Sequence, residues 1–233
     1  NIVPVYGFGE EQGSYYFAME YVAGAKTITE YAEEKNLDMR AKLSLMAEAC
    51  EAVGYGHTKG IIHRDLKPAN IMIRTSEPLD LVLTDFGIAS QTELSLHRTT
   101  DSRTVSYASP EALVGVVGKA SDWWSVGVML LELLTGRHPF AGLNEQVVNY
   151  QLVSKGIVVP SEIDEDWKLL LKGLLTKDTQ KRWVEGQVRR WLEGDRSITV
   201  AYDAEEEAKK YGYRAYEFAG KQYYEPADLA VGL

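Results

Sequence analysis

The stretch IIHRDLKPANIMI, residues 61–73, decides how this sequence is interpreted. It places a histidine, an arginine, an aspartate, a lysine and an asparagine between two runs of apolar residues. A polar surface turn between two buried segments would explain the pattern. So would a loop that its flanking strands hold rigid, so that its polar groups can carry out a reaction. The rest of the sequence has to decide between these two interpretations.

The acidic and amide side chains of this region lie next to short apolar segments. Asp65 and Asn70 belong to the stretch itself, and Asp85 follows a third apolar segment. If the segments are strands that end at one cleft, two carboxylates and an amide oxygen form a site that Mg²⁺ prefers when substrate phosphates complete its shell. Lys67 would place a positive charge beside the same point. Carboxylates that only cap turns are the alternative. The predicted strands are Ile61–Ile62, Ile71–Ile73 and Leu81–Thr84.

The segments before this stretch predict one hairpin and two helices. Residues 1–10 and 14–22 are rich in β-formers and predict an antiparallel hairpin. Residues 28–35 indicate a short helix. Asp38 is a suitable N-cap for a long amphipathic helix that ends near Gly60.

The second half of the chain is predicted to be mostly helical. Ser121 would cap a helix that is apolar nearly all round, as buried central helices are, and Gly136 would end it. The acidic, tyrosine-rich tail contains a candidate hairpin over residues 213–224, with Pro226 starting a last helical turn. Further helices are predicted over residues 144–155, 166–176 and 185–192.

Composition is that of an ordinary globular protein. The 233 residues are 45% hydrophobic and 25% charged, enough for one large domain or two small lobes. The net charge of −9 disfavours a general nucleic-acid-binding role. The single cysteine, Cys50, cannot form an intrachain disulfide and fits a helical core position rather than a nucleophile. No signal peptide is visible, and the longest apolar run, residues 123–134, is too short to span a bilayer. We therefore expect a soluble, cytoplasmic protein.

Five motifs, in a fixed order, resemble those of protein kinases. His63–Asn70 resembles the catalytic loop H-R-D-L-K-P-x-N, and Asp85-Phe86-Gly87 resembles the D-F-G motif that follows it. Ser109-Pro110-Glu111 resembles the A-P-E motif, and residues 121–127 resemble the start of the central helix, D-x-W-S-x-G. Arg182 resembles the late arginine that pairs with the A-P-E glutamate. The chain is similar to a eukaryotic-like serine/threonine protein kinase, of the kind that bacteria also carry.

The resemblance implies an α+β, protein-kinase-like fold and a division of the chain. Residues 1–22 would be the last hairpin of the N-lobe with the hinge, and residues 23–194 the helical C-lobe. Residues 195–233 would form a tail that either packs on the large lobe or docks a partner.

The resemblance also implies catalytic roles and two cofactors, ATP and Mg²⁺. Asp65 would orient the hydroxyl of a protein substrate and accept its proton, and Lys67 would steady the transferred γ-phosphate. Asn70 and Asp85 would hold the magnesium ions. Such catalysis consists mostly of positioning and charge neutralisation.

Other residues of the motifs would support the site. His63 and Phe86 would stack in the hydrophobic column that aligns the site, and Gly87 would give structural support. A buried, neutral, hydrogen-bonded histidine is the alternative for His63, and it agrees with that role. Asp122 would accept hydrogen bonds from the backbone of the catalytic loop. Glu111 would pair with Arg182.

The N-terminal hairpin would lead into the adenine site. Residues 17–22, FAMEYV, resemble the segment that joins the two kinase lobes. Met19 would be the gatekeeper, Glu20 and Val22 would offer backbone groups to adenine, and Met72 would form the floor under the base. For both methionines, plain core filling is the alternative.

The long segment between residues 85 and 110 would hold the substrate and regulatory loops. Lys67 and Thr104 point to serine and threonine as acceptors, although Arg103 stands where the family usually has glycine. Arg64 would need an anionic partner, which phosphorylation of this segment would supply. Incidental hydroxyls in a mobile loop are the alternative. The candidate acceptors are Thr99, Thr100 and Ser102, and the basic residues beside them are His97 and Arg98.

Two kinase motifs do not occur in the sequence. They are the glycine-rich loop and the V-A-x-K lysine; Lys26 follows the hinge and cannot be that lysine. We therefore expect the chain to be a piece of a longer kinase that is poorly active alone. The alternative is a pseudokinase scaffold, against which the intact catalytic set argues. A small-molecule kinase is disfavoured because such enzymes lack the long segment, the S-P-E motif and the partner arginine. The sequence carries no signal for the substrate, the activating signal or the oligomeric state.

Overall fold

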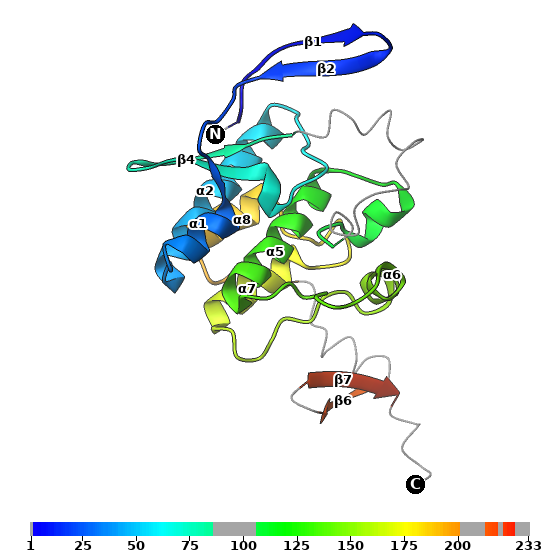
Figure 1. Ribbon diagram of the computed structural model, residues 1–233. Helices are drawn as coiled ribbons and strands as arrows, with labels where there is room; N and C mark the ends of the chain where they lie inside the picture. The colour runs from blue at the N-terminus through cyan, green and yellow to red at the C-terminus, as the bar shows by residue number, and fades with distance from the viewer. Residues whose placement is uncertain (1, 86–105, 201–212, 219–220, 227–233) are drawn as a thin grey trace.

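The computed structural model describes residues 2–85, 106–200, 213–218 and 221–226 (Figure 1). The fold is α+β, as predicted: a set of packed helices with small antiparallel sheets. The helices are α1 (Ile28–Glu34), α2 (Met39–Thr58), α5 (Lys119–Thr135), α6 (Glu145–Ser154), α7 (Glu165–Leu174) and α8 (Glu185–Leu192), with 3₁₀ turns η1 (Pro68–Asn70) and η2 (Pro110–Val114). None of the helices in the described ranges is long and apolar enough to cross a membrane.

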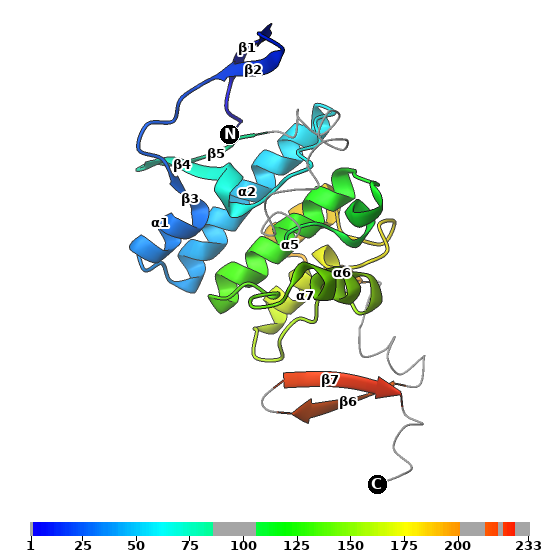
Figure 2. The ribbon, with the colours of Figure 1, turned by 45° about the vertical axis from the view of Figure 1, so that its right-hand side comes forward.

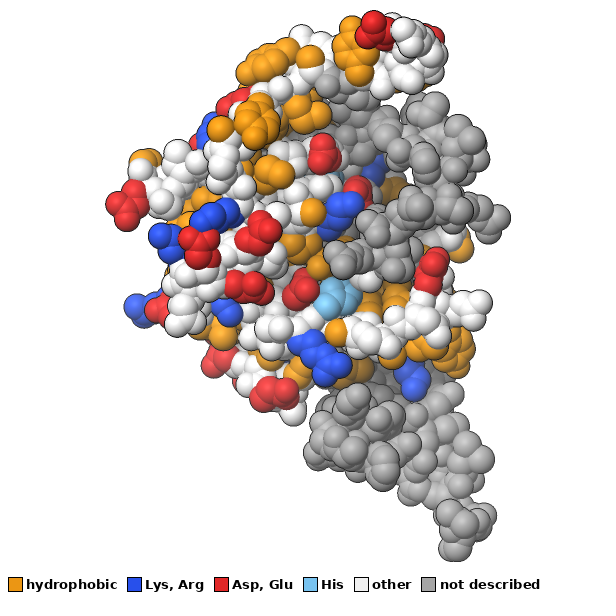
Figure 3. All heavy atoms as spheres, viewed as in Figure 1, with side chains coloured by type: hydrophobic (Ala, Val, Ile, Leu, Met, Phe, Trp, Pro, Cys, Tyr) orange, Lys and Arg blue, Asp and Glu red, His pale blue; other side chains and the backbone are white. Residues whose placement is uncertain are grey.

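The predicted N-terminal hairpin is confirmed. Strands β1 (Val5–Glu11) and β2 (Ser14–Met19) pair antiparallel across a tight turn. Gln12 and Gly13 have φ angles of 51° and 80°, the left-handed pair that two-residue hairpins need. The hairpin extends away from the helices in Figures 1 and 2 and carries exposed apolar side chains in Figure 3.

A second sheet joins the hairpin to the segments around the catalytic-loop stretch. Strands β3 (Lys26–Thr27), β4 (Ile71–Ser76) and β5 (Leu79–Leu83) pair in that order, all antiparallel. The N-terminal segment reaches the same sheet, because the Val3 amide donates to the carbonyl of Leu83 at 3.0 Å. The start of the chain and the strand before Asp85 are therefore fixed to one another.

The first two helices each begin directly after a capping residue, and for α2 it is the predicted one. Thr27 and Glu30 form a reciprocal capping box at the start of α1. The Asp38 side chain accepts a hydrogen bond from the Ala41 amide at 2.8 Å and caps α2. Cys50 lies on the buried side of α2, where burial raises the pKa of its thiol to about 12. The prediction of a core cysteine is thus supported, because such a thiol stays protonated and unreactive.

The prediction of a strand at Ile61–Ile62 is wrong. The Ile61 amide donates to the Gly56 carbonyl at 3.0 Å, and Gly60 has a φ of 77°, so these residues complete the end of α2. The Ile61 amide, which a strand would use for pairing, is hydrogen-bonded to the last turn of the helix instead. The catalytic-loop stretch is therefore held by a helix end on one side and by β4 on the other.

The central helix α5 is as buried as predicted but begins earlier. Every residue from 121 to 131 is buried. Gly118 is the N-cap, and the Ser121 hydroxyl accepts from the Gly118 amide at 3.1 Å, so Ser121 is in the first turn and not the cap itself. Gly136, with a φ of 68°, ends the helix. In Figures 1 and 2 α5 runs through the middle of the helical part.

The C-terminal tail contains the predicted hairpin. Strands β6 (Tyr213–Phe218) and β7 (Lys221–Pro226) pair antiparallel. Pro226 is the last residue of β7, paired with Tyr213, so it does not start a helical turn. A proline is tolerated there because a strand end does not require its missing amide hydrogen.

Candidate active site

A buried aspartate on the central helix holds the catalytic-loop backbone. Asp122 Oδ2 accepts from the His63 amide and lies 2.8 Å from His57 Nε2, and its Oδ1 accepts from the Arg64 amide, each at 2.8 Å. Arg64 has a φ of 73°, a conformation that costs a non-glycine residue free energy. The Asp122 carboxylate offsets that cost, so the predicted support role of Asp122 has a geometric basis.

We expect the Asp122→Asn variant to lower the free energy of unfolding by about 1–3 kcal/mol, because an amide cannot accept at both atoms and leaves a buried donor without a partner. Urea unfolding measures the change. The matched control is Asp38→Asn, since asparagine caps a helix as well as aspartate does. Equal stability losses for the two variants would show that Asp122 holds nothing beyond an ordinary surface carboxylate.

His63 connects this loop to the strand that leads to Asp85. The buried His63 ring lies with Nε2 2.8 Å from the Thr84 carbonyl, and the Thr84 amide donates to the Asn70 carbonyl at 2.9 Å. Burial lowers the pKa of His63, although the negative charge of Asp122 acts in the opposite direction. The neutral ring, donating from Nε2, is the form that the fold favours. The predicted aligning role of His63 therefore agrees with its contacts.

Stability is expected to fall as the pH drops from about 7.5 to 5.5. Below neutral pH, a histidine whose pKa is lowered in the folded state binds fewer protons there than it does in the unfolded chain. In the unfolded chain, a histidine has a pKa of about 6.5. Its contribution is complete above that value and declines below it. His138, whose pKa burial also lowers, acts in the same direction. Urea unfolding at the two pH values checks this, with His63→Gln expected to show a smaller decline. Undiminished stability at pH 5.5 would contradict it.

Asp65 lies beside the two polar residues that the motif places around it. The Asn70 side-chain amide donates to the Asp65 carbonyl at 2.8 Å and to Asp65 Oδ2 at 3.4 Å. Lys67 Nζ lies 2.9 Å from the same Oδ2. Both contacts are on one oxygen, so Oδ1 of Asp65 is the atom left for another hydrogen bond. The side chain is about one third exposed, at 35%, which leaves it accessible.

Asp85 is the third of the predicted oxygen-bearing residues. It lies just after the end of β5 and directly follows Thr84, whose backbone amide donates a hydrogen bond to the Asn70 carbonyl. Its φ of 53° marks a second left-handed residue at this site, and its side chain is exposed. Because the Asn70 nitrogen is turned toward Asp65, its amide oxygen remains available as a ligand. One amide oxygen and exposed carboxylate oxygens suit a hard cation such as Mg²⁺, so the donor set fits the ion that the resemblance implies.

The four residues predicted for the adenine site lie on β2, on β4 and in the segment that follows β2. Met19 ends β2 and Met72 lies in β4, and both are half-buried. The Glu20 amide donates to the Pro4 carbonyl at 2.9 Å, so this amide is already engaged within the chain. The Val22 carbonyl accepts a hydrogen bond from the Ala25 amide at 3.3 Å, whereas the Val22 amide does not take part in this contact.

The predicted pair between Glu111 and Arg182 is present. Arg182 Nη1 and Nη2 donate to the two carboxylate oxygens of Glu111 at 2.6 and 3.0 Å, and the Arg182 side chain is fully buried. Burial acts to raise the pKa of Glu111, but the hydrogen bonds and charge of Arg182 outweigh it, and that pKa lies below its usual range. The pair ties η2 to the segment after α7.

Several predicted residues lie outside the described ranges. They are the D-F-G residues after Asp85, the activation-segment candidates with their basic neighbours, and the substrate-loop residue: Phe86, Gly87, His97, Arg98, Thr99, Thr100, Ser102 and Thr104.

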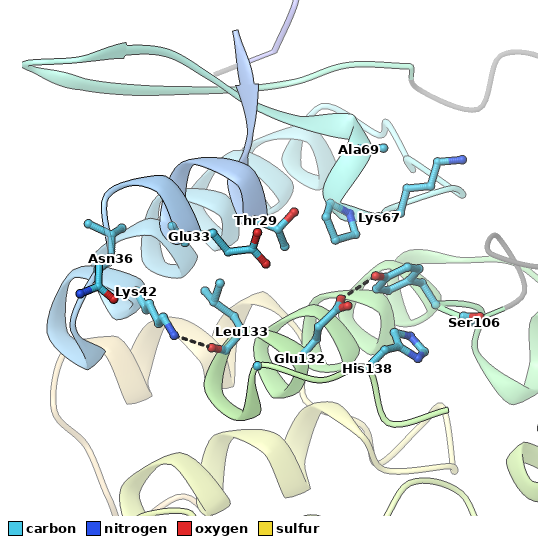
Figure 4. A pocket seen from close by; sticks show the side chains of 15 residues that line it. Thr29, Glu33, Asn36, Lys42, Lys67, Ala69, Ser106, Glu132, Leu133 and His138 are labelled. Atoms are coloured by element: carbon cyan, nitrogen blue, oxygen red, sulfur yellow. Dashed lines mark hydrogen bonds between the residues drawn. The ribbon is translucent and has the colours of Figure 1, made fainter. Parts of the chain in front are cut away.

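The sequence did not reveal some of the polar residues at the site. His57 belongs to no motif and lies among apolar residues of α2, yet it contacts Asp122. Tyr107 donates to Glu132 Oε2 at 2.5 Å beside a cavity of about 750 Å³ (Figure 4). Of the predicted site residues, Lys67 lines this cavity. Glu132 is a charged residue inside the otherwise apolar run of α5, and this position was the sequence signal that could have marked it as a site residue.

These features define a kinase-like C-lobe: a central helix that holds a histidine–arginine–aspartate loop, a second aspartate after the next hairpin, and a buried arginine paired with a half-buried glutamate. Residues 1–190 match the family model described as the protein kinase domain. The chain therefore belongs to the protein kinase domain family.

Relatives of the chain are serine/threonine-protein kinases from plants and bacteria. It is 40% identical to AtPK1/AtPK6 of Arabidopsis thaliana over 141 residues, 60% of this chain and 30% of that protein. It is 41% identical to PrkC of Bacillus subtilis over 146 residues, 61% of this chain and 22% of that protein. It is 36% identical to PknB of Mycobacterium leprae over 189 residues, 78% of this chain and 30% of that protein. The chain thus spans less than a third of the length of each.

Proposed function

We propose that the protein transfers the γ-phosphoryl group of ATP to serine or threonine hydroxyls of protein substrates, in a reaction that requires Mg²⁺. The observation that carries this proposal is the arrangement of Asp65. Its Oδ2 is held by Lys67 and Asn70, in a loop whose backbone Asp122 fixes. A carboxylate held in this way presents one free oxygen to a substrate.

The side chains of this loop divide the work between them. Asp65 Oδ1 would accept the hydrogen bond of the substrate hydroxyl and take its proton as the new bond to phosphorus forms. The ammonium of Lys67, beside Oδ2, would lie next to the transferred phosphoryl group and offset its charge. The amide oxygen of Asn70 and the carboxylate of Asp85 would hold magnesium, which when bound neutralises the phosphate oxygens.

The nucleotide base would lie against the hinge. The Glu20 carbonyl and the Val22 amide are the backbone groups not used by the contacts with Pro4 and Ala25. One is an acceptor and the other a donor, as the edge of adenine requires. Met72 on β4 offers an apolar side chain for the face of the base.

Serine or threonine as the acceptor is supported by the names of the relatives and by Lys67, which occupies the position where tyrosine kinases usually differ. A scaffold without catalysis is the second candidate. The retained contacts of Asp65 with Lys67 and Asn70 favour catalysis, because a scaffold has no need of an accessible carboxylate held beside an ammonium group.

The test uses the full-length protein that contains this chain, with radiolabelled ATP and a generic basic protein as the substrate. We expect label on phosphoserine and phosphothreonine after acid hydrolysis, and none when EDTA removes Mg²⁺. Label on tyrosine, or transfer that EDTA leaves intact, would contradict the proposal. Nucleotide binding without any transfer would favour the scaffold.

A further inference from the structure

The segment between β2 and β3, residues 20–25, has few polar contacts that fix its position, and we call it the hinge segment. In Figure 2 it runs as a loop from the N-terminal hairpin to the start of β3. In the described part of the chain, its backbone makes one hydrogen bond to another segment, from the Glu20 amide to the Pro4 carbonyl at 2.9 Å. The bond from the Ala25 amide to the Val22 carbonyl is local to the hinge segment. Because this segment carries the backbone groups that would face a nucleotide base, any further contact that holds it matters for binding.

A side chain of the neighbouring sheet supplies that further contact. Arg74 Nη2, on β4, lies 3.5 Å from Glu20 Oε2. Within the described residues, no other side-chain hydrogen bond or ion pair joins the hinge segment to the rest of the chain. The second ion pair of Arg74, between Nη1 and Asp80 Oδ2 at 3.2 Å, lies within the sheet and does not reach the hinge segment. Arg74 therefore ties this segment to the sheet.

An irregularity of the sheet places Arg74 for this contact. The pairing of β4 with β5 shifts by one residue between Ile73 and Thr75, so that Arg74 has no partner residue on β5, as the extra residue of a β-bulge has none. Bulges re-aim side chains and are common next to active sites. Arg74 follows Met72, the proposed floor under the base, by two residues on the same strand. Its side chain thus bridges from the strand that carries the floor to the hinge segment.

We propose that Arg74 positions the hinge segment for nucleotide binding, by holding the Glu20 carboxylate so that an adenine ring fits between this segment and Met72. This inference rests on the proposed function. Half-exposed ion pairs add little to the stability of a whole domain. A segment with few other contacts is different, because a ligand that has to order the segment first binds more weakly. Arg74 is thus a positioning residue that acts through Glu20.

The experiment measures the binding of adenosine to the full-length protein by calorimetry. Adenosine is the probe because it is uncharged, so the loss of the positive charge of Arg74 does not weaken its binding directly. We expect Arg74→Met to raise Kd about three- to fivefold, the factor that corresponds to such an ion pair. Arg74→Lys, which keeps the charge without the planar fork, should raise Kd less. The matched control, Arg190→Met, removes an ion pair elsewhere on the surface and should keep the Kd of the parent.

A second set of variants tests whether the effect passes through Glu20. Glu20→Met should raise Kd by a similar factor, and Arg74→Met should add nothing in the Glu20→Met background. In phosphoryl transfer, the KM for ATP should rise with the Kd for adenosine, while kcat and the KM for the protein substrate stay within about twofold of the parent. A loss of overall stability would not divide the kinetic constants in this way. Urea unfolding identifies the variants that fold, and Glu20→Met leaves β4 unchanged if Arg74→Met does not.

Three outcomes would overturn the inference and leave the proposed function standing. They are an unchanged Kd in the Arg74→Met and Glu20→Met variants, an equal rise in Arg190→Met, and a full further rise when Arg74→Met is added to Glu20→Met. If the parent transfers no phosphoryl group, the proposed function fails and adenosine binding alone decides the inference. A parent that does not bind adenosine then overturns it, whereas a loss confined to the Arg74 and Glu20 variants supports it.

Discussion

Replacing Asp65 with asparagine is expected to lower the rate of phosphoryl transfer about a thousandfold while nucleotide binding persists. An amide cannot take the proton of the substrate hydroxyl, and a positioned base contributes roughly two to four orders of magnitude. The contacts of Asn70 and Lys67 lie on one oxygen of Asp65, so an asparagine can keep the geometry of the loop while it loses the chemistry. Single-turnover phosphorylation by the full-length protein measures the step directly.

A matched control exists on β5. Asp80 is 33% exposed and pairs with Arg74 at 3.2 Å, much as Asp65 is 35% exposed and pairs with Lys67. Asp80→Asn should therefore leave the rate near that of the parent. An Asp65→Asn variant as fast as the Asp80→Asn variant would remove the basis for assigning Asp65 as the base.

The Arg182→Met variant is expected to lose about 3–5 kcal/mol of unfolding free energy, the largest stability effect we anticipate. The guanidinium is fully buried, and besides Glu111 it donates to the carbonyls of Ala120, Lys177 and Thr176 at 2.8, 3.1 and 2.7 Å. Methionine fills similar space but leaves the half-buried Glu111 carboxylate without its cation.

The surface pair between Arg190 and Asp195 provides the comparison. Arg190 is 53% exposed, and such pairs contribute about 1 kcal/mol or less, so Arg190→Met should have a small effect. In the double variant Glu111→Gln with Arg182→Met, part of the loss should be recovered, because no unpaired charge remains. If Arg182→Met proved no more destabilising than Arg190→Met in urea unfolding, the pair of Glu111 and Arg182 would contribute no more to stability than a surface ion pair.

Local sequence signals predicted most of the fold correctly. Asp38 was recognised as a cap because its short acidic side chain precedes a run at helical spacing, and it caps α2. The apolar run after Ser121 indicated a buried helix for a similar reason. The strand predicted at Ile61–Ile62 failed because β-branched residues also fit the turn that closes a helix, where Gly60 sets the geometry.

Contacts between distant segments lay beyond such signals. His57 lies 65 positions before Asp122. Its apolar neighbours in the sequence do not predict that its ring contacts a carboxylate. Glu33 and Glu132 likewise line one cavity although they lie on two helices far apart in the sequence, α1 and α5. The catalytic loop and its support by Asp122 could be predicted because both belong to the kinase motifs, whereas His57 belongs to none of them.

Nucleotide-dependent Mn²⁺ binding, followed by electron paramagnetic resonance, tests most directly whether Asn70 and Asp85 form a cation site beside Asp65. Manganese serves as the probe because it accepts the same oxygen ligands as magnesium. In the full-length protein we predict a bound Mn²⁺ signal that appears with ADP and is lost in the Asp85→Asn variant, while Asp80→Asn keeps it. An Asp85→Asn variant that binds Mn²⁺ and ADP as tightly as the parent would contradict the account.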